Sequence, residues 1–212
     1  MKVKVCGITS YEDAAMAVDQ GVDALGFNFF PSSPRFIQPE DADRIIRRLP
    51  PFLIAVGLFV NVSRPSQVDE TARKAGVQII QLHGDETPEY CRALAGRPLI
   101  KAVRIGAAGV AEKLEEYEVR AFVLDARDDT LYGGTGRSFD WRLVKNIRCP
   151  RPVILAGGLR PDNVRDAIRM VRPYGVDVCS GIESAPGKKD PGKLTQFMKE
   201  VRNACDFPDF TG

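Results

Sequence analysis

The residue of this sequence best placed to act as a base is a cysteine near its beginning. Cys6 closes a short apolar run, stands next to Gly7, and follows Lys4 by two residues. That spacing puts the lysine on the same face of an extended strand, where its ammonium group would favour the nucleophilic thiolate at neutral pH. The alternative is that Cys6 is a packing residue, which is the commoner role of an isolated cysteine among apolar side chains.

A carboxyl group suited to donate a proton follows another apolar run. Asp125 comes directly after Phe122, Val123 and Leu124. A carboxyl group at the end of a hydrophobic strand is expected to have a raised pKa, so that it stays protonated long enough to act as a general acid. Capping a helix or forming a salt bridge is the alternative role of this aspartate.

Two further polar residues are candidates for binding a substrate. Arg35 ends the loop Pro31–Arg35, which contains two prolines, and its planar guanidinium group suits a carboxylate; the alternative is an ordinary solvated arginine. His83 is the only histidine, so it cannot form a two-histidine metal centre or a triad with a second histidine. We expect it to contact the substrate or to have a structural role.

Two loops that contain glycine have the composition of a phosphate site. Gly157 and Gly158 follow one apolar run, and Ser180 and Gly181 follow the next. Glycine allows backbone N–H groups to approach phosphate oxygens, and a helix N-terminus adds partial positive charge. A terminal phosphate is therefore the expected ligand, unless these glycines only make tight turns.

Parallel strands can bring all of these groups together. Short β-branched runs alternate with segments of helical periodicity along the whole chain. The predicted strands are Val3–Ile8, Ala24–Phe29, Ile54–Phe59, Gln78–Leu82, Leu99–Val103, Ala121–Leu124, Val153–Leu155 and Val176–Cys179. The predicted helices are Tyr11–Gln20, Pro39–Leu49, Pro65–Lys74, Thr87–Leu94, Gly109–Leu114, Asp140–Asn146, Pro161–Val171 and Pro191–Cys205. Three glycines, Gly21, Gly76 and Gly175, are each expected to end a helix just before a strand.

Eight strand–helix units are the number that closes a (β/α)8 TIM barrel. The candidate groups all follow strands, and the active sites of such barrels lie at the C-terminal ends of the strands. A doubly wound open sheet has the same alternation but usually carries a nucleotide-binding fingerprint, which the sequence lacks. We therefore predict that residues 1–212 form a single (β/α)8 barrel domain of the α/β class.

The composition narrows the class of partner. The 30 basic and 28 acidic residues give a net charge of only +2 and are scattered, which argues against a nucleic-acid or membrane-surface partner. No apolar run is long enough for a signal peptide or a membrane span, so a cytoplasmic location is expected. The five cysteines include no CxxC pair, which predicts reduced thiols and no structural zinc site. A small-molecule substrate and no metal are expected, and Cys179 is interpreted as a packing residue.

Eight segments of the sequence, in order and spanning nearly its whole length, resemble those of the phosphoribosylanthranilate isomerase family. They are KVCGIT (4–9), ALGFNFFPSSPR (24–35), VGLFVN (56–61), QLHGDE (81–86), VLD (123–125), GGTGRSFDW (133–141), ILAGGLRPDNV (154–164) and VDVCSGIE (176–183), the last followed by PGKKD (186–190).

The resemblance implies an Amadori rearrangement of N-(5-phosphoribosyl)anthranilate in tryptophan biosynthesis, with no cofactor and no metal. It implies that Asp125 is the general acid that opens the ribose ring and that Cys6 is the base that removes the proton next to the imine. It further implies that Arg35 holds the anthranilate carboxylate and that Gly157, Gly158, Ser180 and Gly181 bind phosphate. The assembly is expected to be a monomer or a homodimer.

Two other functions are weighed against this one. The related isomerase of the histidine pathway resembles a duplicated half-barrel with aspartates as both acid and base, whereas the first strand here carries Cys6. A non-catalytic phosphosugar-binding barrel would keep the phosphate loops and lose turnover, and the presence of both Cys6 and Asp125 argues against it.

Overall fold

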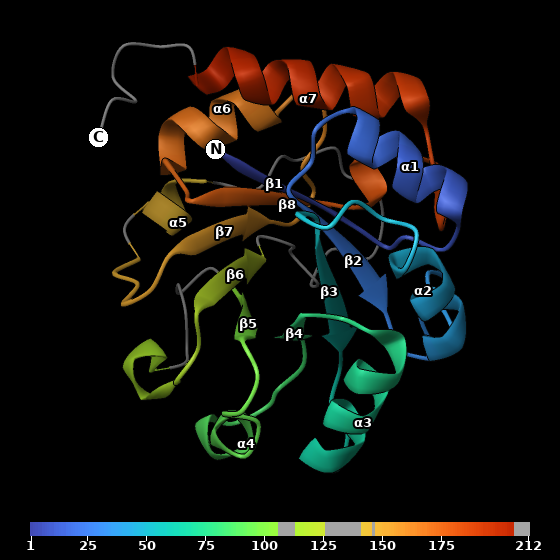
Figure 1. Ribbon diagram of the computed structural model, residues 1–212. Helices are drawn as coiled ribbons and strands as arrows, with labels where there is room; N and C mark the ends of the chain where they lie inside the picture. Colours follow the sequence, from blue (N-terminus) through green and yellow to red (C-terminus); the bar gives the residue numbers. More distant parts are fainter. Residues whose placement is uncertain (106–112, 126–140, 146, 206–212) are drawn as a thin grey trace.

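Eight parallel strands close into a barrel in the order in which they occur along the chain, β1 to β8. A computed structural model of the protein describes residues 1–105, 113–125, 141–145 and 147–205, and in it the helices surround the barrel (Figure 1). The strands are β1 Lys2–Cys6, β2 Ala24–Asn28, β3 Ile54–Phe59, β4 Ile79–Leu82, β5 Leu99–Arg104, β6 Ala121–Asp125, β7 Val153–Ala156 and β8 Gly175–Val178. The predicted fold class is confirmed.

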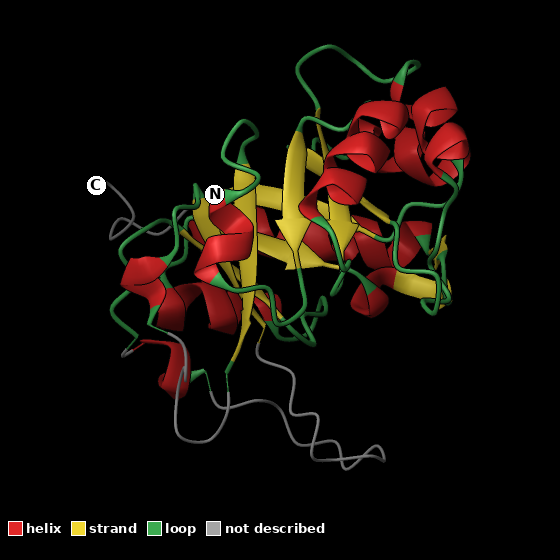
Figure 2. Ribbon diagram, turned by 90° about the horizontal axis from the view of Figure 1, so that it is seen from below, coloured by secondary structure: helices red, strands yellow, loops and turns green. Residues whose placement is uncertain are grey.

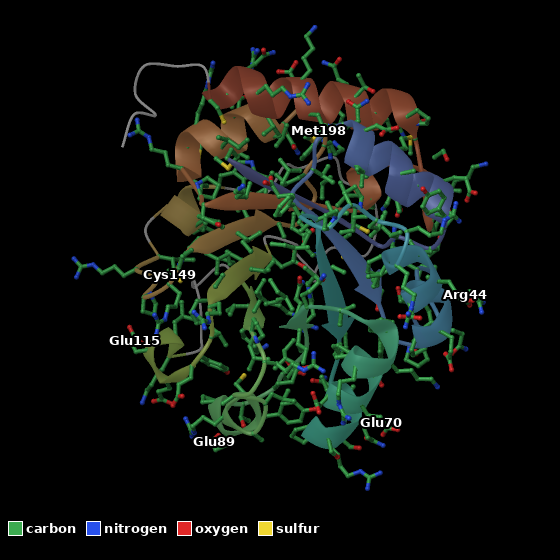
Figure 3. The ribbon with its side chains drawn as sticks, viewed as in Figure 1. Arg44, Glu70, Glu89, Glu115, Cys149 and Met198 are labelled. Carbon is green, nitrogen blue, oxygen red and sulfur yellow. The ribbon has the colours of Figure 1, made fainter. Side chains whose placement is uncertain are left out.

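The helices that follow the strands lie outside the ring of strands. They are α1 Tyr11–Asp19, α2 Pro39–Ile46, α3 Pro65–Ala75, α4 Pro88–Arg92, α5 Arg142–Lys145, α6 Val164–Val171 and α7 Pro191–Cys205. Figure 2 shows the strands enclosed by helices from a second direction, and in Figure 3 the charged side chains of Arg44, Glu70 and Glu89 extend outward from α2, α3 and α4. None of the helices in the described part of the chain is both long and apolar enough to cross a membrane.

Each strand places alternate side chains inside the barrel and against the helices, which produces two apolar layers. The large layer between strands and helices includes Phe27, Leu82 and Phe122, whereas a small separate cluster fills the inside. That inner cluster consists of Ile100, Ala102, Ala121, Val123 and Ala156. Its members come from the neighbouring strands β5, β6 and β7.

Local signals explain where several helices begin and end. The hydroxyl oxygen of Ser10 accepts a hydrogen bond from the Asp13 amide at 3.2 Å and caps α1, while α2 and α3 each begin at a proline. Gly76 ends α3 in the left-handed conformation, as predicted (φ 70°).

The prediction for Gly175 was wrong, because this residue is the first of β8. Arg172, with φ 51°, adopts the left-handed conformation that ends α6 instead. Gly175 is required for a different reason, since a Cβ at this position would lie 2.9 Å from the carbonyl oxygen of Lys2 on the neighbouring strand.

Other predicted elements differ at their ends or lie outside the described residues. Most of the predicted helix 109–114 lies outside them, and its last residue, Leu114, opens a short 3-10 turn, Leu114–Glu116. Helix α6 begins three residues later than predicted, after a turn that contains Pro161. Residues 133–140 of the GGTGRSFDW segment also lie outside the described part, while Trp141 is buried.

One element was not predicted at all. After β8 and a 3-10 turn, Ser180–Ile182, the chain forms an antiparallel hairpin of β9 Glu183–Ala185 and β10 Lys188–Lys189. This hairpin is not part of the barrel, and its strands of three and two residues are too short to give a periodic pattern in the sequence.

Candidate active site

A cavity of about 340 Å³ opens where the strands end. Among the described residues, those that line it lie at or just beyond the ends of seven of the eight strands, all except β5. Seven of the predicted site residues line it, namely Cys6, Arg35, His83, Asp125, Gly157, Gly158 and Ser180. A larger hollow of about 800 Å³ lies between α1 and α2 and contains none of them.

Glycine residues make room for the Cys6 thiol and for the residues around it. Gly26 on β2 lies opposite Cys6 in the strand register, and a Cβ there would lie 2.8 Å from the Cys6 sulfur and 3.1 Å from Cε of Lys4. Gly7 has φ 75°, and a Cβ there would lie 2.7 Å from Cδ of Arg35. The glycines therefore allow the thiol, the lysine and the arginine to pack together at the end of β1.

The surroundings of Cys6 favour its thiolate. A hydrogen bond from the Cys179 thiol is the main cause that lowers the pKa of Cys6 well below its ordinary value; burial opposes it, and the Lys4 and Lys189 ammonium groups add to the lowering. The same interaction raises the pKa of Cys179. Cys179 was interpreted from the sequence as a packing residue, but it lines the cavity and contacts the candidate base. The prediction for Cys179 was incomplete.

A buried ion pair lies beside Cys6 inside the barrel. The Nζ atom of Lys4 is 2.7 Å from Oδ2 of Asp177, its partner in the register of β1 and β8, and both side chains are only 6% exposed. Burial opposes the charged form of Lys4, but the charges of Asp177 and Cys6 outweigh it and raise the pKa of Lys4. Lys4 is therefore a cation at neutral pH.

Asp177 lines the cavity but was not predicted from the sequence as a site residue. Its Oδ1 atom is buried and accepts no hydrogen bond from the described residues, and burial raises the pKa of this carboxyl to about 6 despite the Lys4 ammonium. A charged residue inside the apolar run Val176–Val178 was the available signal, because a strand buried on both faces seldom carries an unpaired carboxylate.

His83 links the candidate acid to a buried amide. Its Nε2 atom lies 3.2 Å from Oδ2 of Asp125, and its Nδ1 atom lies 3.0 Å from Nε2 of Gln81, a fully buried residue of β4. With the Gln81 amide as donor to Nδ1, the neutral ring carries its proton on Nε2 and donates it to Asp125. The structure brings together the only histidine and the candidate acid, 42 residues apart in the chain.

The loop that begins with His83 is held by a second buried ion pair. The carboxylate of Glu86 accepts hydrogen bonds from the amides of Gly84 and Asn61, and Lys101 lies 3.3 Å from it. Both charged side chains are only 2% exposed. Glu86 and Lys101 therefore fix the position of His83 from outside the barrel.

Arg35 lies at the cavity with part of its guanidinium group already bound. Nε and Nη2 donate to the two carboxylate oxygens of Glu183 at 2.9 and 2.6 Å. The loop that carries it is ordered by Ser33, whose hydroxyl oxygen accepts hydrogen bonds from the Arg35 amide and the Asn28 side chain. The arginine is thus 19% exposed and held in place, in contrast to a solvated surface arginine.

The two glycine-containing loops lie side by side at the cavity wall. Gly157 and Gly158 have φ values of 85° and 64°, which only glycine adopts readily, and a Cβ on Gly158 would meet no atom within 4 Å. Gly181 does not line the cavity. A Cβ there would lie 1.9 Å from the carbonyl oxygen of Leu159, so Gly181 allows the loop after β8 to pack against the loop after β7.

The arrangement is suited to acid–base chemistry on a small phosphorylated molecule. It places a thiol with a lowered pKa, a carboxyl group hydrogen-bonded to histidine, and an arginine around one cavity, with glycine-rich loops at one wall. Within the described ranges, no three His, Cys, Asp or Glu side chains gather in a way that could hold a metal ion.

Comparison with known proteins identifies a family that the chain matches. Residues 3–200 match the family described as N-(5'-phosphoribosyl)anthranilate isomerase. The protein of that name from Trichlorobacter lovleyi is 50% identical over 205 residues, which cover 96% of this chain and 99% of that protein. The crystal structure of the phosphoribosyl anthranilate isomerase of Thermotoga maritima is 44% identical, with a TM-score of 0.88 over 96% of this chain and 99% of that one.

A third match contains a bound ligand. This phosphoribosyl anthranilate isomerase, in complex with reduced 1-(o-carboxyphenylamino)-1-deoxyribulose 5-phosphate, is 40% identical and has a TM-score of 0.80. The match covers 96% of this chain and 99% of the chain in that structure. A family match that extends over nearly the whole chain agrees with the barrel and with the groups at its cavity, and the chain therefore belongs to the N-(5'-phosphoribosyl)anthranilate isomerase family.

Proposed function

We propose that the protein isomerises N-(5-phosphoribosyl)anthranilate to 1-(2-carboxyphenylamino)-1-deoxyribulose 5-phosphate, a step of tryptophan biosynthesis. The observation that carries this proposal is the position of a low-pKa thiol and a histidine-bound carboxyl group at one cavity in a chain of this family. The reaction moves hydrogen within one molecule, so an acid and a base account for it without a redox cofactor. We therefore propose that no cofactor or metal takes part.

The acid and the base have separate tasks in this proposal. Asp125 gives a proton to the ribose ring oxygen, the bond from that oxygen to the first sugar carbon breaks, and the anthranilate nitrogen becomes an imine. The Cys6 thiolate then removes the proton from the neighbouring carbon, which yields an enolamine. The enolamine tautomerises to the ketone, and the product has the same atoms as the substrate.

The other cavity residues are proposed to bind the two ends of the substrate. Arg35 pairs with the anthranilate carboxylate, and the loops with Gly157, Gly158 and Ser180 receive the phosphate. Gly181 contributes indirectly, because the absence of a side chain allows the two loops to pack closely together. We propose that His83 contacts the substrate next to Asp125, and that residues 1–212 form one catalytic domain whose assembly is a monomer or a homodimer.

A turnover assay tests the proposed function. Freshly generated phosphoribosylanthranilate is fluorescent, and the purified protein is expected to remove this fluorescence at a rate proportional to protein concentration. A non-catalytic phosphosugar-binding barrel, the second candidate function, would bind the substrate and leave the fluorescence to decay at the rate seen without protein.

The phosphate assignment predicts competitive inhibition. Inorganic phosphate should raise the apparent KM and leave kcat unchanged, because it occupies the loops at Gly157, Gly158 and Ser180 only when the substrate is absent. The measurement compares phosphate with sodium chloride at the same ionic strength, which controls for screening. Equal effects of the two salts on KM would show that phosphate does not bind at these loops.

A further inference from the structure

The β9–β10 hairpin carries two buried charges of opposite sign. Glu183 opens β9 with a side chain only 4% exposed, and Lys189 ends β10 with a side chain that is fully buried. Their charged atoms, Oε1 and Nζ, lie 2.9 Å apart. Buried charges are costly to desolvate and gain more from several partners than from one. Glu183 and Lys189 each have further hydrogen-bond partners at the site.

Glu183 holds one edge of the guanidinium group of Arg35. It accepts from Nε and Nη2, which is the bidentate geometry that orients an arginine most strictly. Burial opposes ionisation of Glu183, but hydrogen bonds from Arg35 and Lys189 outweigh it and lower the pKa of this carboxyl to about 2. With that edge bound, the Nη1 end of Arg35 is the part that a carboxylate in the cavity would meet.

Lys189 connects the same carboxylate to the end of β1. Its Nζ atom donates to the carbonyl oxygen of Cys6 at 2.6 Å and lies 3.9 Å from the sulfur of Cys179. One carboxylate, Glu183, thus lies between two cations, Arg35 and Lys189, which leaves a net positive charge beside the cavity. Such a charge favours both a thiolate and a bound carboxylate.

We propose that Glu183 and Lys189 are positioning residues of the site, Glu183 by orienting Arg35 toward the substrate carboxylate and Lys189 by holding the strand end and stabilising the thiolate of Cys6. The inference rests on the proposed function for the substrate it names. It explains why the chain adds a short hairpin after the last strand of the barrel.

The fold of the hairpin has anchors other than the two charges. The hydroxyl group of Thr9 donates to the carbonyl oxygen of Gly187 at 2.7 Å, and Nζ of Lys193 donates to the carbonyl oxygen of Glu183 at 2.7 Å. Neither bond needs the charged side chains of Glu183 and Lys189. Substitutions that keep side-chain size are therefore suited to test the two charges separately.

The test of Glu183 is Glu183→Gln, which keeps the shape and removes the charge. An amide would present N–H to the N–H donors of Arg35 or lose one of the two hydrogen bonds, so the guanidinium group would no longer be fixed. We expect KM to rise by about 10- to 100-fold, the range for one hydrogen bond to a charged group, with a smaller fall in kcat.

The test of Lys189 is Lys189→Met, read out by alkylation of Cys6 with iodoacetamide at a series of pH values. The peptide that contains Cys6 is followed by mass spectrometry. The pH at which half of the thiol is reactive should rise, because one of the cations beside the sulfur is lost. The other titratable or charged groups near this sulfur are Lys4 on its own strand, Asp177 and Cys179 from β8 and beyond, and Arg35 from the loop after β2.

The matched control is Lys188→Met, because Lys188 is the exposed neighbour of Lys189 on the same strand, and it should leave KM and the alkylation profile unchanged. If a single variant fails to fold, the double variant Glu183→Gln, Lys189→Met is used in its place, because it removes both buried charges together. An unchanged KM in Glu183→Gln, or an unchanged alkylation profile in Lys189→Met, would overturn the corresponding role. Alkylation needs no substrate, so this part of the test stands even if the wild-type protein shows no turnover.

Discussion

Cys6→Ala is expected to lower kcat by about a hundredfold to ten-thousandfold, the usual contribution of a positioned proton-transfer group. The variant keeps the cavity and the arginine, so KM should change much less than kcat. Steady-state fluorescence kinetics measure both. The matched control is Cys149→Ala, the same substitution in a loop that does not line the cavity (Figure 3). This control variant should leave kcat unchanged.

The pH profile identifies how Cys6 acts. A base works in its deprotonated form, so kcat/KM should rise with pH through the pKa of Cys6. Because the Cys179 hydrogen bond and the cations Lys4 and Lys189 lower that pKa, the rise should be complete at a lower pH than an ordinary thiol would require. A Cys6→Ala protein with normal kcat and reduced thermal stability would show that Cys6 is a packing residue.

The strand ends could be predicted from the sequence because the apolar runs are short and the polar residues follow them directly. Cys6, Asp125 and His83 each come at the end of such a run or immediately after it, and the closed barrel then brings them to one cavity. Lys4 could be assigned to the face of Cys6 from the two-residue period of a strand alone. These predictions need only local pattern and one general property of barrels.

The pairs between distant segments could not be predicted in this way. Lys4 meets Asp177 because β8 closes against β1, and that register depends on the whole barrel. Arg35 and Glu183 are 148 residues apart, and their contact depends on the hairpin and on the space that Gly7 leaves for the arginine. Such ion pairs follow from tertiary packing, which a single sequence does not encode as a periodic signal.

Asp125→Asn is expected to lower kcat by about a hundredfold to ten-thousandfold as well, since an amide at neutral pH does not supply the proton that opens the ribose ring. The fold should survive, because the amide oxygen of asparagine can still accept the hydrogen bond from Nε2 of His83. As the chain has one histidine, the ¹⁵N resonances of its ring can be assigned directly and report whether that hydrogen bond is kept.

The pH profile of Asp125→Asn separates a general acid from a residue that only orients His83. An acid works in its protonated form, so the wild-type rate should fall at high pH, and this limb should be absent in the variant while the rise assigned to Cys6 remains. Asp85→Asn, the same change at an exposed aspartate two residues after His83, should keep both limbs. If Asp125→Asn retained the high-pH limb and lost activity only in proportion to a disturbed histidine signal, Asp125 would be a positioning residue, and the acid would have to be another group at the cavity. Asp177 would then be the first residue to test, because its buried carboxyl has a raised pKa of about 6 and lines the same cavity.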